Sequence, residues 1–112
     1  NNQKFITNPF LFSFMLVNII KTYRDVVAIC DSELLGKCFE DDIFQLNVKE
    51  SFYKGEKKTE QEVIQIIKDM KSEDATFNIV GERSTNCAVK AGLISKDSIK
   101  TIQGIPFALV LM

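Results

Sequence analysis

The residues best suited to chemistry lie in two short segments, one around Asp31 and one around Arg83. Arg83 is one of only two arginines, and its planar guanidinium suits a phosphate or a carboxylate. Gly81, two residues before it, leaves room for a ligand to approach the N–H groups of a helix N-terminus, which favour anions. The two segments therefore predict an anion-binding site with these candidate residues: Asn78, Glu82, Arg83, Asp31 and Lys37.

The same residues also fit a structural role. Glu82 places a negative charge in the first turn of that helix, where it complements the helix dipole without any ligand. Arg83 is equally suited to an ion pair with one of three acids: Glu33, Asp31 or Glu50. Both interpretations, an anion site and a structural cap, stay open at the level of sequence.

A second candidate site combines aromatic and basic residues. Phe52 and Tyr53 precede a Lys54-Gly55 turn, and two further lysines follow at 57 and 58. Aromatic rings beside lysines are typical of proteins that stack single-stranded bases and hold the phosphates. The alternative is that Phe52 lies in the core, Tyr53 is half-buried and the lysines are solvated. The candidate binding residues here are Phe52, Tyr53 and Lys54.

Composition excludes several kinds of chemistry. Histidine is absent, which removes the commonest general base and metal ligand. Cys30, Cys38 and Cys87 form no CxxC pair, so we expect free thiols, at least two of them buried, and neither a metal nor another cofactor. The 14 basic and 15 acidic side chains nearly cancel, so binding to nucleic acid would need a local patch.

The elements that would position these residues form one domain in a chain of 112 residues. Two β-rich runs, 16–23 and 25–30, predict an antiparallel hairpin, and Asp31 or Ser32 then caps a single helical turn. Alternation over 43–48 predicts a strand with one buried face, formed by Phe44, Leu46 and Val48. Residues 50–56 are expected to form a loop.

The helices and the remaining strands lie in the second half. Thr59 and Glu62 form a capping box at the start of an amphipathic helix over 59–71. A second helix is expected over 78–91, followed by strands over 98–103 and 106–112, the last of them central and buried. These elements predict an α+β fold: an antiparallel or mixed sheet of four to six strands with the two helices packed on one face.

Residues 1–14 differ in texture from the rest. The apolar run from Phe10 to Ile20 is too short to span a bilayer, and no signal-peptide cleavage site follows it. One interpretation is a hydrophobic arm, in which Phe10, Phe12 or Phe14 packs on the sheet or on a second copy, making residues 5–16 a homodimer contact. The other is that Met15 is the natural start and residues 1–14 lie outside a single domain of residues 15–112.

Five motifs follow one another along the chain: DSELLGKCF (31–39), ESFYKGE (50–56), NIVGER (78–83), AGLI (91–94) and GIPFA (104–108). With these motifs the chain resembles the archaeal family called domain of unknown function 424, over residues 15–112. The resemblance implies a small cytoplasmic archaeal protein without an established function, suspected of a place near translation or RNA.

Two functional hypotheses follow from these residues. The first is a binding module that contacts RNA or a ribonucleoprotein of translation through a basic patch: Lys54, Lys57, Lys58 and Arg83. The second is a small enzyme or ligand-binding protein for a phosphorylated or nucleotide-like molecule near 31–37 and 78–83. The lack of histidine and of a catalytic motif favours the binding module over an enzyme. A basic strip would support the first, and a cleft that gathers the charged candidates would support the second.

Overall fold

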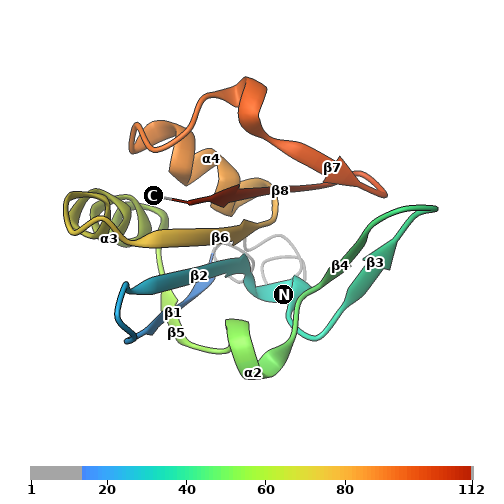
Figure 1. Cartoon of the computed structure of the whole chain (residues 1–112), viewed down its shortest axis with the longest axis horizontal. Coiled ribbons are helices and arrows are strands. Elements are labelled where there is room, and N and C mark those ends of the chain that lie inside the picture. Colours follow the sequence, from blue (N-terminus) through green and yellow to red (C-terminus); the bar gives the residue numbers. More distant parts are fainter. Residues whose placement is uncertain (1–13, 112) are drawn as a thin grey trace, which may run out of the picture.

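A computed structural model describes residues 14–111 and contains, within that range, a six-stranded mixed sheet. Its strands are β1 (Met15–Ile20), β2 (Val26–Asp31), β5 (Glu56–Lys58), β6 (Thr76–Val80), β7 (Lys100–Ile102) and β8 (Ile105–Val110). They lie in the order β5-β1-β2-β6-β8-β7 (Figure 1). Helices α3 (Glu60–Ser72) and α4 (Glu82–Lys90) share a core with one face of this sheet. The predicted α+β class is confirmed.

The pairing of β2 decides where the candidate residues meet. β1 and β2 are antiparallel, as the predicted hairpin requires, whereas β2 and β6 are parallel. Parallel neighbours end at the same edge of a sheet, and Cys30 lies opposite Val80. The residues that follow this pair, Asp31 after Cys30 and Gly81 after Val80, therefore lie side by side at that edge.

Helix α3 forms as its sequence predicts. The Thr59 hydroxyl accepts a hydrogen bond from the Glu62 backbone N–H, and the Glu62 carboxylate accepts one from the Thr59 N–H. The four residues of the predicted apolar stripe all join the core: Val63, Ile66, Ile67 and Met70. This packing of helix on sheet is confirmed, and its burial of apolar surface is the main stabilising contribution to such a fold.

The second helix begins later than the sequence predicts. Residues 76–80 form the central strand β6, and α4 starts at Glu82, so the helix expected from Asn78 is wrong at its start. Phe77 and Ile79 alternate into the core, and both edges of β6 are hydrogen-bonded to neighbouring strands. Tertiary pairing and period-2 burial thus outweigh the local helical pattern.

The opposite sheet face is covered by shorter elements. They are the turn η2 (Ser32–Leu34), the hairpin of β3 (Cys38–Glu40) and β4 (Gln45–Asn47), and helix α2 (Glu50–Tyr53). Residues 50–56, expected as a loop, thus form α2 and the first residue of β5. In the predicted 43–48 strand, Val48 is fully buried and Leu46 partly so, but Phe44 is exposed, which corrects its expected burial.

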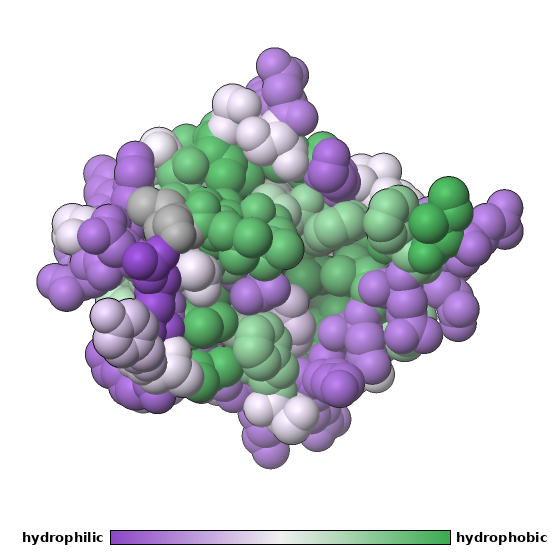
Figure 2. All heavy atoms as spheres, in the orientation of Figure 1, coloured by the Kyte–Doolittle hydropathy of each residue, from purple (hydrophilic) through white to green (hydrophobic). Residues whose placement is uncertain are grey.

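The structure also tests the predicted central strand over 106–112 and the predicted burial of the cysteines. β8 lies between β6 and β7, one place from the edge, so it is not the buried central strand that was predicted, and Leu109 on it is 58% exposed. A hydrophobic surface is visible over this strand in Figure 2. All three cysteines are free; Cys30 and Cys87 are buried, as expected for at least two of them, whereas Cys38 is exposed.

The start of the described chain is held at the end of β2. The carbonyl oxygen of Phe14 accepts a hydrogen bond from the Ser32 N–H at 3.3 Å, and Phe14 is half-buried. Phe10 and Phe12 lie outside the described residues. A packing arm and a homodimer through residues 5–16 therefore stay predictions.

Candidate functional site

The buried carboxylate of Asp31 is the centre of the first candidate site. Its side chain is at the end of β2, only 3% of the residue is exposed, and it reaches the first turn of α4. Its Oδ2 accepts the Arg83 N–H at 3.1 Å, and its Oδ1 accepts both the N–H and the hydroxyl of Ser84, at 2.9 and 2.7 Å. Asp31 therefore caps α4, across the fold, and makes no side-chain cap for the η2 turn that follows it.

Gly81 makes this approach sterically feasible. Its φ of 113° lies in the region that residues with a Cβ avoid. A Cβ added at this position would lie 2.3 Å from Cγ of Asp31, well inside contact distance. The glycine that suggested space for a ligand thus makes space for a carboxylate of the same chain.

Arg83 is paired within the protein. Its Nη2 donates to Oε1 of Glu33 at 2.6 Å and its Nη1 to Oε2 at 3.1 Å, the two-point geometry that guanidinium and carboxylate favour. Nη2 also donates to the Phe14 carbonyl at 3.3 Å, and Nη1 lies 3.9 Å from Oδ2 of Asp31. The structural ion pair considered from sequence is therefore formed, with Glu33 as its main partner.

The pKa values of Asp31 and Glu33 are shifted in opposite directions by their surroundings. Burial raises the pKa of Asp31, and the hydrogen bonds from Ser84 and Arg83 only partly offset this effect. Burial also acts to raise the pKa of Glu33, but the hydrogen bond and charge of Arg83, helped by Lys37, outweigh it and leave that pKa lowered. Glu33 thus stays ionised at neutral pH, where it pairs with Arg83 beside the joint between β2 and α4.

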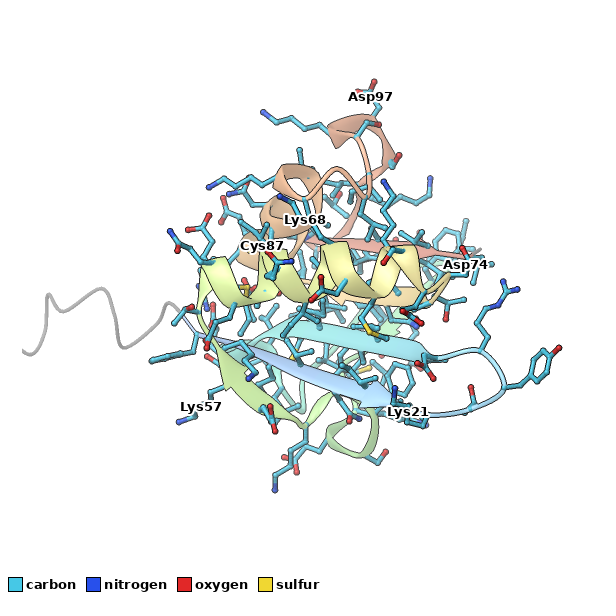
Figure 3. The ribbon with its side chains drawn as sticks, turned by 90° about the vertical axis from the view of Figure 1, so that its left-hand side faces the viewer. Lys21, Lys57, Lys68, Asp74, Cys87 and Asp97 are labelled. Atoms are coloured by element: carbon cyan, nitrogen blue, oxygen red, sulfur yellow. The ribbon has the colours of Figure 1, made fainter. Side chains whose placement is uncertain are left out.

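The thiols near this joint offer no ready nucleophile. Burial is the main cause that raises the pKa of Cys30 to about 12 and that of Cys87 to about 11. Both therefore stay protonated at neutral pH, where a reactive cysteine would have to be a thiolate. Cys87 lies between α3 and α4, as Figure 3 shows, with its sulfur 3.8 Å from that of Met15. This contact is core packing.

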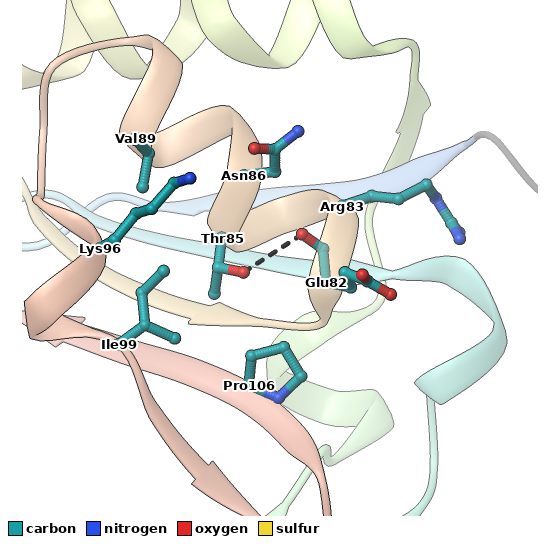
Figure 4. A pocket seen from close by; sticks show the side chains of 8 residues that line it. All are labelled: Glu82, Arg83, Thr85, Asn86, Val89, Lys96, Ile99 and Pro106. Carbon is teal, nitrogen blue, oxygen red and sulfur yellow. Dashed lines mark hydrogen bonds between the residues drawn. The ribbon is translucent and has the colours of Figure 1, made fainter.

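An open hollow of about 610 Å³ borders the joint on the far side of α4. Three apolar side chains line it: Val89, Ile99 and Pro106. Its polar lining includes Glu82, Asn86 and Lys96, and Arg83 reaches away from it in Figure 4. Of the predicted anion-site residues it is bordered by Glu82 and Arg83, while Asp31 and Lys37 are not among its lining residues. Lys96 belongs to it although no sequence pattern singled that residue out.

The remaining candidates lie on the other face of the sheet. Asn78 alternates with Phe77 and Ile79, so it faces away from α4 and from the Asp31 cap. Tyr53 is only 5% exposed and meets Phe52 edge to face at 5.0 Å, and burial raises its pKa to about 12. Tyr53 therefore offers no exposed ring for a base to stack on, which removes it from the predicted stacking platform, whereas Phe52 is half-buried.

Lysines nevertheless collect beside these rings. Lys49 and Lys54 flank α2, and Lys57 lies on β5 opposite Leu16, on the sheet face that α2 covers. All three are exposed, and the salt bridges among residues 14–111 include none of them, whereas Lys58 pairs with Glu56 at 3.2 Å. We call Lys49, Lys54 and Lys57 the lysine edge. Figure 3 shows Lys57 projecting outward beside β5.

No helix within residues 14–111 is long and apolar enough to cross a membrane. In the same range, no group of three or more His, Cys, Asp or Glu side chains is placed to hold a metal ion.

The sequence profile of the family described as "Protein of unknown function (DUF424)" matches residues 20–112. The chain belongs to this family. A crystal structure of an uncharacterized conserved protein from Methanopyrus kandleri is similar, with a TM-score of 0.75 and 26% identity, over 88% of this chain and 94% of that one. A search of curated proteins finds no match. The resemblance inferred from the five motifs is thereby confirmed.

Proposed function

We propose that this member of the family is a binding module that contacts RNA or a ribonucleoprotein partner through the lysine edge. The observation that carries the proposal is the contrast in pairing between the two groups of cations. Arg83 is held by Glu33, whereas Lys49, Lys54 and Lys57 have no ion-pair partner among the described residues. Unpaired, exposed lysines are free to displace the counterions of a phosphate backbone.

The closed state of the Asp31 joint supports binding over catalysis. Each carboxylate oxygen of Asp31 already accepts a hydrogen bond from α4. A general acid, base or nucleophile must instead have a free atom within reach of a substrate. Because Asp31 caps α4 and Arg83 pairs with Glu33, both side chains stabilise the fold, and the exposed lysines remain available to a partner.

The lysine edge is anchored on rigid elements. Gly55 joins α2 to β5 where a Cβ would lie 2.1 Å from the Val17 carbonyl oxygen, so this turn presses directly against β1. Tyr53 fixes α2 from within, as part of the core with Leu16. The backbone that carries the lysines at both ends of α2 is therefore fixed relative to the sheet.

The test is binding to a fluorescent single-stranded RNA, followed by anisotropy at several salt concentrations. We expect the variant K54Q/K57Q to bind several-fold more weakly than the wild type. Each lost phosphate contact flattens the slope of log K against log salt by about 0.7, so the double variant should flatten it by about 1.4. RNA of mixed sequence is the appropriate probe because these contacts carry no base information.

A matched control separates this surface from general charge. K68Q/K100Q removes the same two charges from exposed lysines on α3 and β7, neither of which has an ion pair among the described residues. Figure 3 shows Lys68 on α3, away from Lys57. We expect this control to retain at least half of the affinity of the wild type. Equal losses in both variants, or no RNA binding by the wild type at low salt, would refute the proposal.

A further inference from the structure

The tip of the small hairpin exposes two large apolar side chains. Ile43 is 82% exposed and Phe44 is 62% exposed, although the alternating pattern placed Phe44 on a buried face. The hairpin extends from the body of the molecule in Figure 1, and Figure 2 shows hydrophobic beside hydrophilic residues at its far end. We call residues 40–44 the acidic tip, because Glu40, Asp41 and Asp42 precede the two apolar residues.

The acidic tip is held in one shape. Asp41 Oδ1 accepts the backbone N–H groups of Ile43 and Phe44, at 2.9 and 2.7 Å. The Asp41 N–H donates to the Phe44 carbonyl at 3.0 Å, which closes the turn. Preorganised turns lose less conformational entropy when a partner binds them. The apolar pair is therefore displayed by a formed turn.

The base of the hairpin is also fixed. Phe39 and Leu46 face each other across β3 and β4 and pack against the core on that face of the sheet. The Gln103 amide, in the turn between β7 and β8, donates to the Glu40 carbonyl at 2.6 Å. The tip thus projects from an anchored arm, and its position relative to the large sheet is defined.

The charge of the tip restricts the kind of partner. Glu40, Asp41 and Asp42 form no salt bridge among residues 14–111. The backbone N–H groups of Phe44 and Ile43 lower the pKa of Asp41, which keeps this carboxylate ionised. Three adjacent negative charges repel phosphates and anionic lipid, and they favour a surface rimmed by cations.

We propose that the acidic tip docks on a basic protein, inserting Ile43 and Phe44 into an apolar patch rimmed by lysine or arginine. Apolar anchors at the centre with charges around them are the usual arrangement of a small protein contact. The proposal goes beyond the lysine edge and does not depend on it. If both hold, the lysine edge faces the RNA and the acidic tip faces a protein of one ribonucleoprotein.

The experiment titrates the full chain, labelled with nitrogen-15, with synthetic amphipathic helical peptides while amide shifts are followed by NMR. One peptide carries leucines on one face and lysines on the other; the second has glutamates in place of the lysines. We expect saturable shifts centred on residues 40–46 with the lysine peptide and none there with the glutamate peptide. Binding should weaken at least about tenfold in I43S/F44S, because the apolar anchors are lost.

Two further variants, E40Q/D42N and Y23S/L111S, test the role of charge at the tip and control for the loss of exposed apolar side chains elsewhere. E40Q/D42N removes two charges but keeps the Asp41 turn, and should weaken binding several-fold with a flatter salt dependence. The control Y23S/L111S removes two exposed apolar side chains elsewhere and should change affinity less than twofold. K54Q/K57Q should leave peptide binding unchanged, and I43S/F44S should leave RNA binding unchanged, so either proposal can fail alone.

Several outcomes would overturn the docking proposal. One is the absence of saturable shifts at the tip, and another is equal binding of the two peptides. A third is the same affinity for I43S/F44S and for the wild type. Shifts at the tip that depend on protein concentration without peptide, and vanish in I43S/F44S, would assign the surface to a second copy of this chain instead.

Discussion

The joint between β2 and α4 and the acidic tip both contain carboxylates, but their carboxylates do different things. At the joint, Asp31 is buried and accepts hydrogen bonds from a helix fifty-odd positions further along the chain. At the tip, Asp41 is exposed and accepts hydrogen bonds from residues two and three positions away. The first arrangement ties distant segments together, whereas the second shapes one turn and leaves its apolar neighbours in solvent. The difference lies in the cationic partner: Arg83 neutralises the acids of the joint, whereas no cation among the described residues pairs with the acids of the tip.

The largest effect is expected at Gly81. In G81A the new Cβ would clash with Asp31, the backbone would be strained at positive φ, and the cap of α4 would be lost. Backbone strain of about 1–2 kcal/mol and a lost cap of about 1–2 kcal/mol together predict a loss of roughly 3 kcal/mol in the free energy of unfolding. Urea denaturation followed by circular dichroism measures this loss.

Gly92 provides the matched control for that substitution. It also has a positive φ, 78°, but a Cβ there would meet no atom within 4 Å. G92A should therefore cost only the backbone strain, about 1 kcal/mol. If G81A and G92A were equally destabilised, the close approach of Asp31 to α4 would contribute nothing to stability. The carboxylate of the joint would then stabilise the fold no more than those of the tip.

A smaller, pH-dependent effect is expected at Glu33. Its pKa is lowered from the ordinary value of 4.5 in the folded protein, so its ion pair with Arg83 stabilises the fold above that value. The contribution disappears as the pH falls through the folded pKa. Since Glu33 is partly exposed and screened, E33Q should cost less than about 1 kcal/mol at pH 7.

The sign of this effect can be checked against a second substitution. The difference in unfolding free energy between wild type and E33Q should shrink toward zero as the pH is lowered below 4.5. The raised pKa of Asp31 acts in the opposite direction but is common to both proteins, so it largely cancels. E73Q, at an exposed acid outside the ion pairs of the described residues, should show no such trend. A difference that grows at low pH would contradict the assignment of Glu33 as the partner of Arg83.

Local interactions explain which parts of the fold could be predicted. The capping box joins Thr59 to Glu62 within one turn, and the β1–β2 hairpin pairs neighbouring runs, so both follow from short patterns. The start of α4 could not be located in this way. The residues at 78–83 are compatible with a helix. Residues 78–80 are a strand because β6 pairs with β2 and β8, which the local sequence does not show.

The candidate sites show the same limit. The sequence predicts either an anion site or an ion pair for Arg83. It cannot select Glu33 as the partner, because the two residues lie far apart in the chain and no spacing rule connects them. The sequence predicts that Asp31 or Ser32 caps the turn that follows, because a sequence shows only near neighbours, but the groups that donate to Asp31 lie on α4. Phe44 was assigned to the core by alternation, which cannot show that the strand ends at a projecting turn.

The smallest effect is expected at the acidic tip. Ile43 and Phe44 are exposed, and the bonds that hold the turn use their backbone and the side chain of Asp41. I43S/F44S should therefore change the free energy of unfolding by no more than about 0.5 kcal/mol, as is usual for surface substitutions. Urea denaturation at pH 7 of this variant beside G81A makes the contrast direct. A loss above about 2 kcal/mol would mean that the tip packs on the fold, and its apolar pair would then be structural and unavailable to a partner.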